Sequence, residues 1–329
     1  MNLLRVVGRV ALAIVGLAVV GYLVHGAGPG RVLHILMQAW RWLPLIVLCE
    51  GAQAFADFAG LRFILRERWE QVPVRTWVRS GSIAYAMMVL LPAGRAAGEV
   101  TRATLLARHI GAPRAATAST LLHAVYLSAN GVLSLAACLV VAMSYGSQTL
   151  LAALLAGNAA VQCLICTGLI LTLRHERLAQ WLERMRRRLF PHARPSSPIE
   201  PEARRRFPWA SAGTCVLGRS VQLVQYGLVL VAVGGVGSVR NAFVAHGIHL
   251  VGATLGDFVP SQLGVVDSLY RAFAPDLGFA DAPARALSIA FVVRIAQLIF
   301  ASACVLAAAL TRNEEPQPGA ASARVDVHS

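Results

Sequence analysis

Six long apolar segments constrain this chain more than any other feature. They cover residues 6–24, 43–65, 115–143, 149–173, 213–237 and 284–311. A helix needs about 20 mainly apolar residues to cross the hydrocarbon core of a bilayer. Only 14% of the residues are charged, against about 25% in soluble proteins. The sequence therefore predicts an all-α polytopic membrane bundle with about six full spans, and it excludes a soluble enzyme and a disordered chain.

Arginine-rich loops predict the orientation of the bundle. The net charge is +14, and all 30 basic residues are arginines. The segment 62–79 carries five arginines and the loop 174–208 carries ten, which is typical of cytoplasmic loops. We therefore expect a protein of the bacterial inner membrane with both termini in the cytoplasm. Because the charge is scattered over loops rather than gathered on one face, nucleic acid is not an expected partner; the expected partners are membrane lipids with anionic head groups.

Two apolar pieces between the predicted spans are too short or too broken to cross a membrane. They cover residues 81–92 and 242–260. The spans at 115–143 and 149–173 already connect the two basic regions, so one more crossing would place those regions on opposite sides. We therefore predict that residues 80–112 form a re-entrant hairpin and that 242–283 form a second one from the opposite side. A full crossing by 93–112 is the alternative.

The two hairpins resemble each other and predict an inverted repeat, with halves at about residues 43–143 and 213–311. An acid follows the proline by seven residues in both: Glu99 follows Pro92, and Asp267 follows Pro260. A competing register pairs Gly94, Gly98 and Glu99 with Gly252, Gly256 and Asp257. Repeats of opposite topology with broken helices are a common transporter plan, with the binding site between them.

Charged residues within these membrane elements are the candidate lipid-binding residues. They are Arg95, Glu99, Arg102, Asp257, Asp267, Arg271 and Arg294. A lone charge at the centre of a membrane helix costs about 2.5–3.5 kcal/mol on insertion scales, so such residues meet a partner or a wet cavity. We expect Arg95 and Arg102 to hold a phosphate or another anionic head group while Glu99 orients them. A structural ion pair is the alternative here, and helix capping is the alternative for the two aspartates.

Other polar residues within the spans give weaker indications. Glu50 and Asp57 lie on one helical face, which suits a cavity wall, a counter-ion for an arginine, or plain packing toward the bundle interior. Arg294 is expected to meet an acid of the repeats, whereas snorkelling can explain Arg219. His246 is interpreted as a hydrogen-bonded interior histidine. The sequence contains no nucleophile, nucleotide-binding or paired zinc motif, so neither a cofactor nor a metal ion is expected.

The remaining segments complete a single membrane domain over residues 1–312. The loop 174–212 begins with apolar residues at helical spacing, including Leu178, Trp181 and Met185. This pattern predicts an amphipathic helix on the inner leaflet followed by a linker, with a solvated loop as the alternative. The polar tail 313–329 is expected to be disordered.

The motifs Gly98-Glu99-x-x-Arg102 and Pro260-x-x-x-Gly264-x-x-Asp267 resemble those of the flippase-like family. This is the membrane domain of lysylphosphatidylglycerol synthases and of stand-alone proteins, including some associated with hopanoid biosynthesis. The glycine pair usual after the second proline is Ser261-Gln262 here, and the acid is an aspartate rather than a glutamate. The resemblance implies translocation or export of a polar-headed, isoprenoid or hopanoid lipid, without aminoacyl transfer. A membrane-embedded lipid-modifying enzyme and a scaffold for lipid-biosynthesis enzymes are the alternatives.

Overall fold

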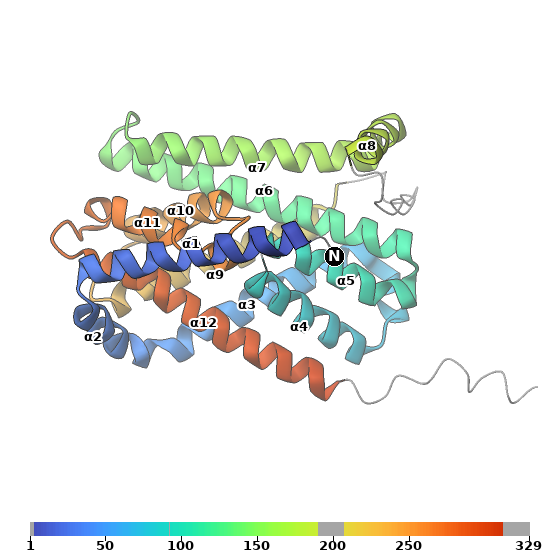
Figure 1. Ribbon diagram of the computed structural model, residues 1–329. Coiled ribbons are helices and arrows are strands. Elements are labelled where there is room, and N and C mark those ends of the chain that lie inside the picture. The colour runs from blue at the N-terminus through green and yellow to red at the C-terminus, as the bar shows by residue number, and fades with distance from the viewer. Residues whose placement is uncertain (1–2, 92, 190–206, 312–329) are drawn as a thin grey trace, which may run out of the picture.

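The computed structural model describes residues 3–91, 93–189 and 207–311, and their regular structure is entirely helical (Figure 1). Within these residues, five segments are long and apolar enough to span a membrane. They contain α3 (Leu43–Leu65), α6 (Ala112–Tyr145), α7 (Leu150–Arg174), α9 (Trp209–Ala232) and α12 (Pro283–Leu310). The all-α polytopic bundle is therefore confirmed, and five of the six predicted spans are found.

The N-terminal region differs in part from the prediction. The first predicted span, residues 6–24, lies within the 25-residue helix α1 (Leu3–Ala27). A short helix, α2 (Pro29–Ala39), follows it and was not predicted from the sequence. Gly28 has φ +89, a conformation that favours glycine, and Pro29 begins the next helix. These two residues turn the chain between α1 and α2.

Two helical hairpins lie inside the bundle and approach each other from opposite ends (Figure 1). The first hairpin comprises α4 (Val74–Leu90) and α5 (Gly94–Ile110), and the second comprises α10 (Val239–Leu255), a turn at Pro260–Gln262 and α11 (Val265–Ala272). The arms α4, α5 and α10 each have 17 residues, which gives a length of about 25 Å. The hairpin predicted for residues 80–112 is therefore present as a helical pair.

The tips of the two hairpins contact each other directly. The Ala93 backbone N–H donates to the Asp257 carbonyl at 2.6 Å, and the Ser261 hydroxyl donates to the Val89 carbonyl at 3.1 Å. At the open end of the first hairpin, Thr76 Oγ1 lies 3.3 Å from His109 Nε2. The first arm of this hairpin therefore begins, and the second arm ends, at the same end of the bundle.

Glycine at two positions lets the arms of the first hairpin pack closely. A Cβ atom on Gly94 would lie 1.9 Å from the Met88 carbonyl oxygen, and one on Gly98 would lie 2.6 Å from the Ala84 carbonyl oxygen. Close backbone approach of this kind needs residues without a side chain. Gly94 and Gly98 lie on the second arm of their hairpin, whereas Gly252 lies on the first arm of the other. Only the alignment that matches the two prolines therefore pairs residues on corresponding arms of the two hairpins.

Arginines gather at one end of the bundle. This end, called the Arg-rich end below, is on the right in Figure 1 and carries the links from α3 to α4, from α5 to α6 and from α7 to α8. The helix α8 (Glu176–Leu189) lies across it, nearly end-on in the view where α7 runs lengthwise. The predicted amphipathic segment is thus helical, and Trp181 and Met185 are exposed. The predicted linker and tail lie largely outside the described residues.

Candidate functional site

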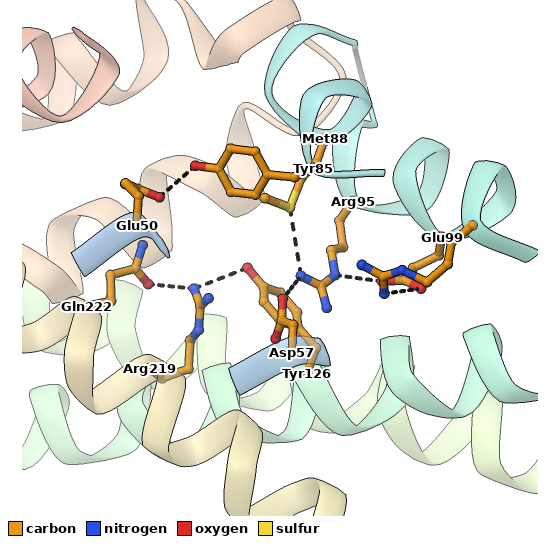
Figure 2. A network of polar contacts seen from close by, with 10 residues as sticks. Glu50, Asp57, Tyr85, Met88, Arg95, Glu99, Tyr126, Arg219 and Gln222 are labelled. Carbon is orange, nitrogen blue, oxygen red and sulfur yellow. Dashed lines mark hydrogen bonds and ion pairs between the residues drawn. The ribbon is translucent and has the colours of Figure 1, made fainter. Parts of the chain in front are cut away.

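A chain of alternating charges runs from α3 along α5 (Figure 2). Arg95 Nη1 donates to Asp57 Oδ2 at 2.5 Å, and Arg95 Nε lies 3.4 Å from Glu99 Oε1. Arg102 Nη1 donates to both Glu99 carboxylate oxygens, at 2.9 and 3.0 Å. Spacings of three and four residues place Arg95, Glu99 and Arg102 on one face of α5. Glu99 thus contacts both arginines, and Asp57 provides the counter-ion that was one interpretation of its position.

Tyr126 on α6 links this chain to a second arginine. The guanidinium carbons of Arg95 and Arg219 lie 3.8 and 4.7 Å from the centre of the Tyr126 ring. Arg219 also donates to the Tyr126 hydroxyl at 3.3 Å and to Gln222 Oε1 at 2.5 Å. Cation–π contacts reach about 2 kcal/mol when they are desolvated. Snorkelling is therefore the wrong interpretation of Arg219, because its side chain is buried against Tyr126 and Gln222.

Neutral polar groups surround the other acid of α3. Glu50 accepts from the Tyr85 hydroxyl at 2.8 Å and from the Gln225 amide at 2.9 Å. Gln225 in turn accepts from the Gln53 amide at 2.9 Å. The two acids of α3 therefore have different partners: Asp57 binds an arginine, whereas Glu50 binds a phenol and an amide.

The acid of the second hairpin pairs with a different helix. Arg294 of α12 donates to both carboxylate oxygens of Asp267, at 3.2 and 3.1 Å. The same carboxylate accepts from the Gly264 backbone N–H at 2.9 Å, at the start of α11. The expected meeting of Arg294 with an acid of the repeats is found. Asp267 also caps its own helix, as the alternative interpretation proposed, although it is fully buried rather than at an interface.

A cavity of about 440 Å³, called the central cavity below, connects most of these groups. Both hairpin tips contribute to its wall, through Leu91 and Gly94 on one side and Asp257 and Ser261 on the other. Its polar lining includes Glu50, Gln53, Asp57, Tyr85, Arg95, His123, Tyr126, Asn130, Arg219, Gln222, His249, Asp257, Arg294 and Gln297. Buried charges are stable only when they are paired and hydrogen-bonded or meet water. The arrangement provides several fixed donors and acceptors around a space that can hold a polar group.

The predicted site residues do not all meet at this cavity. Arg95, Asp257 and Arg294 line it, whereas Glu99 and Arg102 line an adjoining groove. Asp267 is fully buried behind Arg294. Arg271 lies away from the cavity: a Cβ atom on Gly26 of α1 would lie 3.2 Å from its Nη1 atom.

Several residues of the network were not singled out from the sequence. They are Gln53, Tyr85, Tyr126, Gln222 and Gln225. A signal for the glutamines was present, because Arg219, Gln222 and Gln225 recur at helical spacing within an apolar span. Gln222 Oε1 also accepts a hydrogen bond from His246 Nε2 at 3.1 Å, and His246 is the hydrogen-bonded interior histidine that the sequence predicted. In the described parts of the chain, no group of three or more His, Cys, Asp or Glu side chains is placed to hold a metal ion.

The helical bundle and its buried polar cavity define a multi-pass membrane protein. The chain matches the family model described as the lysylphosphatidylglycerol synthase TM region over residues 6–304. This match covers most of the sequence, so the chain belongs to that family, whose members are membrane proteins involved in lipid handling. Searches of curated proteins and of solved structures found no match.

Proposed function

We propose that the protein moves a polar-headed lipid, or an isoprenoid or hopanoid lipid, from one leaflet of the membrane to the other. The observation that carries the proposal is the central cavity, which both hairpin tips line and which contains Arg95, Arg219 and Arg294. A polar head group needs such a polar, hydrogen-bonding environment to pass the hydrocarbon core. An anionic head group fits best, because arginine binds phosphate and carboxylate through several donors.

In this proposal the two hairpins are re-entrant and form the moving parts of an inverted repeat. The longest arms, α4, α5 and α10, measure about 25 Å and are shorter than a hydrocarbon core of about 30 Å, and the tips of the two hairpins meet inside the bundle. Separation of the tips on one side at a time exposes the cavity to each leaflet in turn, as in other transporters built from repeats. The lipid tails remain in the bilayer throughout.

The proposed location is the inner membrane of a bacterium, with the Arg-rich end and both termini in the cytoplasm. Support comes from the arginines in and beside the links at that end, including Arg66 between α3 and α4, Arg75 in the first turn of α4 and Arg174 at the end of α7, because cytoplasmic loops are rich in Lys and Arg. The exposed Trp181 on α8 suits a helix that lies at the inner membrane surface. Enzymes of lipid biosynthesis are proposed partners on the same side.

The test is a leaflet-exchange assay with the full chain in vesicles of phosphatidylethanolamine and phosphatidylglycerol. Wild-type protein should speed the exposure of a fluorescent phosphatidylglycerol to a reductant outside the vesicles. Glu99→Gln and Arg102→Ala should each reduce the rate at least about tenfold, which corresponds to about 1.4 kcal/mol. The control is Arg31→Gln, which removes an exposed arginine of α2. Equal rates for all these proteins would contradict the proposal.

A further inference from the structure

A second cavity, called the lateral groove below, adjoins the central cavity. It has a volume of about 370 Å³ and lies between α3, α4, α5 and α12. Much of its wall is apolar, and the side chains of Phe55 and Val78 at this wall are 70% and 41% exposed. The groove therefore opens on the apolar surface of the bundle, where lipid chains would surround a membrane protein.

The lateral groove and the central cavity share part of their lining. Asp57, Tyr85, Met88 and Arg95 line both spaces. Arg95 Nη1 lies 3.7 Å from the Met88 sulfur, so these two side chains are in contact where the spaces adjoin. Methionine changes rotamer easily because its side chain is unbranched. A small movement of Met88 would therefore join the two spaces without breaking the ion pair between Arg95 and Asp57.

The apolar groove contains the whole chain of alternating charges. Arg95 and Glu99, in the middle of the chain, each contact two oppositely charged side chains. Arg102, at its end, pairs with one carboxylate among the described residues. An arginine has five N–H donors, so Arg102 can bind a further anion while it keeps its contact with Glu99. An apolar wall beside an arginine with free donors matches a molecule that has a hydrocarbon chain and an anionic group.

We propose that the lateral groove binds a glycerophospholipid from the surrounding bilayer, with one acyl chain along the wall formed by α4 and α12 and its phosphate at Arg102. This inference rests on the proposed function and adds the route by which the lipid reaches the central cavity. The lipid enters sideways through the groove, and its head group then passes Met88 and Arg95 into the central cavity. Apolar burial of the chain and a charge-assisted contact to the phosphate both stabilise the complex.

A single substitution can fill the groove and leave the charges in place. Gly81 on α4 lines the groove, and a Cβ atom there would meet only Phe58 Cδ2, at 3.9 Å. Gly81→Leu is therefore tolerated by the backbone and occupies the space of the acyl chain. Gly157→Leu is the matched control, because a Cβ atom on this residue of α7 meets nothing within 4 Å. Both variants add the same side chain to a helix of the bundle.

The experiment uses full-length protein in vesicles that contain phosphatidylglycerol with a diazirine on one acyl chain. After illumination, mass spectrometry maps the lipid adducts. Adducts should concentrate on groove residues such as Ser82 and Phe300, and Gly81→Leu should lower their yield about tenfold, whereas Gly157→Leu should not. A diacylglycerol with the same diazirine but no phosphate should label the wild-type groove less, and Arg102→Gln should lower the phosphatidylglycerol yield to that level.

The outcomes separate this inference from the proposed function. Adducts spread evenly over the exposed helices, or groove adducts unchanged by Gly81→Leu, would overturn the groove as a lipid site. Equal labelling by the two lipids would overturn the phosphate contact at Arg102. Leaflet exchange that continues at the wild-type rate in Gly81→Leu would overturn the lateral route but leave translocation intact. Groove adducts without any leaflet exchange by the wild-type protein would instead support the groove and contradict the proposed function.

Discussion

The two hairpins follow the same sequence pattern but place their charges differently. In the first hairpin, Glu99 pairs with Arg95 and Arg102 of its own helix, and all three side chains line a cavity or groove. In the second, Asp267 is fully buried and pairs with Arg294 of α12. The arginine of its own helix, Arg271, lies against α1 instead.

This difference indicates separate roles for the two acids. Asp267 fixes the second hairpin to α12 and caps α11, so we expect its charge to support the fold. Glu99 lies where two arginines meet open space, so we expect its charge to support lipid binding. Equal spacing after a proline therefore does not imply an equal role, because Glu99 pairs with arginines of its own helix, whereas Asp267 pairs with Arg294 of another helix.

The largest expected effect separates these roles by stability. Asp267→Ala leaves Arg294 without its carboxylate and removes the cap of α11, and it should lower the free energy of unfolding by about 3–5 kcal/mol. Glu99→Gln should lower it by only about 1–2 kcal/mol, because Arg95 keeps Asp57 and the new amide oxygen can still accept a hydrogen bond from Arg102. Thermal unfolding of the purified proteins in the same detergent measures the loss of stability in both variants. A Glu99→Gln protein less stable than Asp267→Ala would contradict the assignment of roles.

An intermediate effect is expected at the contact between the tips. Ser261 has φ +50, a left-handed conformation that is strained for serine, and its hydroxyl donates to the Val89 carbonyl of the other hairpin. Ser261→Ala keeps the strain and loses the hydrogen bond, so it should destabilise by about 1 kcal/mol. Ser261→Gly loses the bond but relieves about 1–2 kcal/mol of strain, so its unfolding temperature should equal or exceed that of the wild type.

The control for the tip is Ser128→Ala. The Ser128 hydroxyl donates to the Val125 carbonyl within α6, so this variant removes a hydroxyl without affecting contact between the hairpins. If Ser261→Ala and Ser261→Gly unfold at the same temperature, backbone strain is not stored at this tip.

The smallest effect is expected at Arg271. Its Nη1 atom is buried and has no hydrogen-bond partner among the described residues, and it lines neither the central cavity nor the lateral groove. Arg271→Gln should therefore change the rate of leaflet exchange by less than about twofold, which is below 0.5 kcal/mol. A tenfold loss in the same vesicle assay would show that the second hairpin uses its arginine as the first hairpin does.

Elements that depend on local pattern could be predicted from the sequence. The long spans follow from apolar length, and the first hairpin follows from charge counting together with an apolar piece that is too short to cross, residues 81–92, followed by a charged segment. The helix α2 was missed because Pro29–Ala39 is too short and too mixed in polarity to read as a span. Its formation depends on packing against α12 rather than on its own sequence.

The partners in the site could be predicted only in part. Glu99 and Arg102 are three residues apart, so their pairing follows from helix geometry. The contacts of Arg219 with Tyr126 and of Asp57 with Arg95 join residues 93 and 38 positions apart. Such contacts depend on which helices are neighbours, which a single sequence does not specify. The same limit explains why Arg271 was grouped with residues that it does not meet.

The most direct test of the account is the side of the membrane from which each hairpin can be labelled. In a cysteine-free protein, single cysteines at Val74 and Ala112 mark the two open ends of the first hairpin, and cysteines at Val239 and Ala280 mark those of the second; all four positions are exposed. A maleimide that cannot cross membranes should label the first two from the Arg-rich side and the last two from the other side. Labelling of positions 74 and 112 from opposite sides would make α4 and α5 a full crossing and contradict the account.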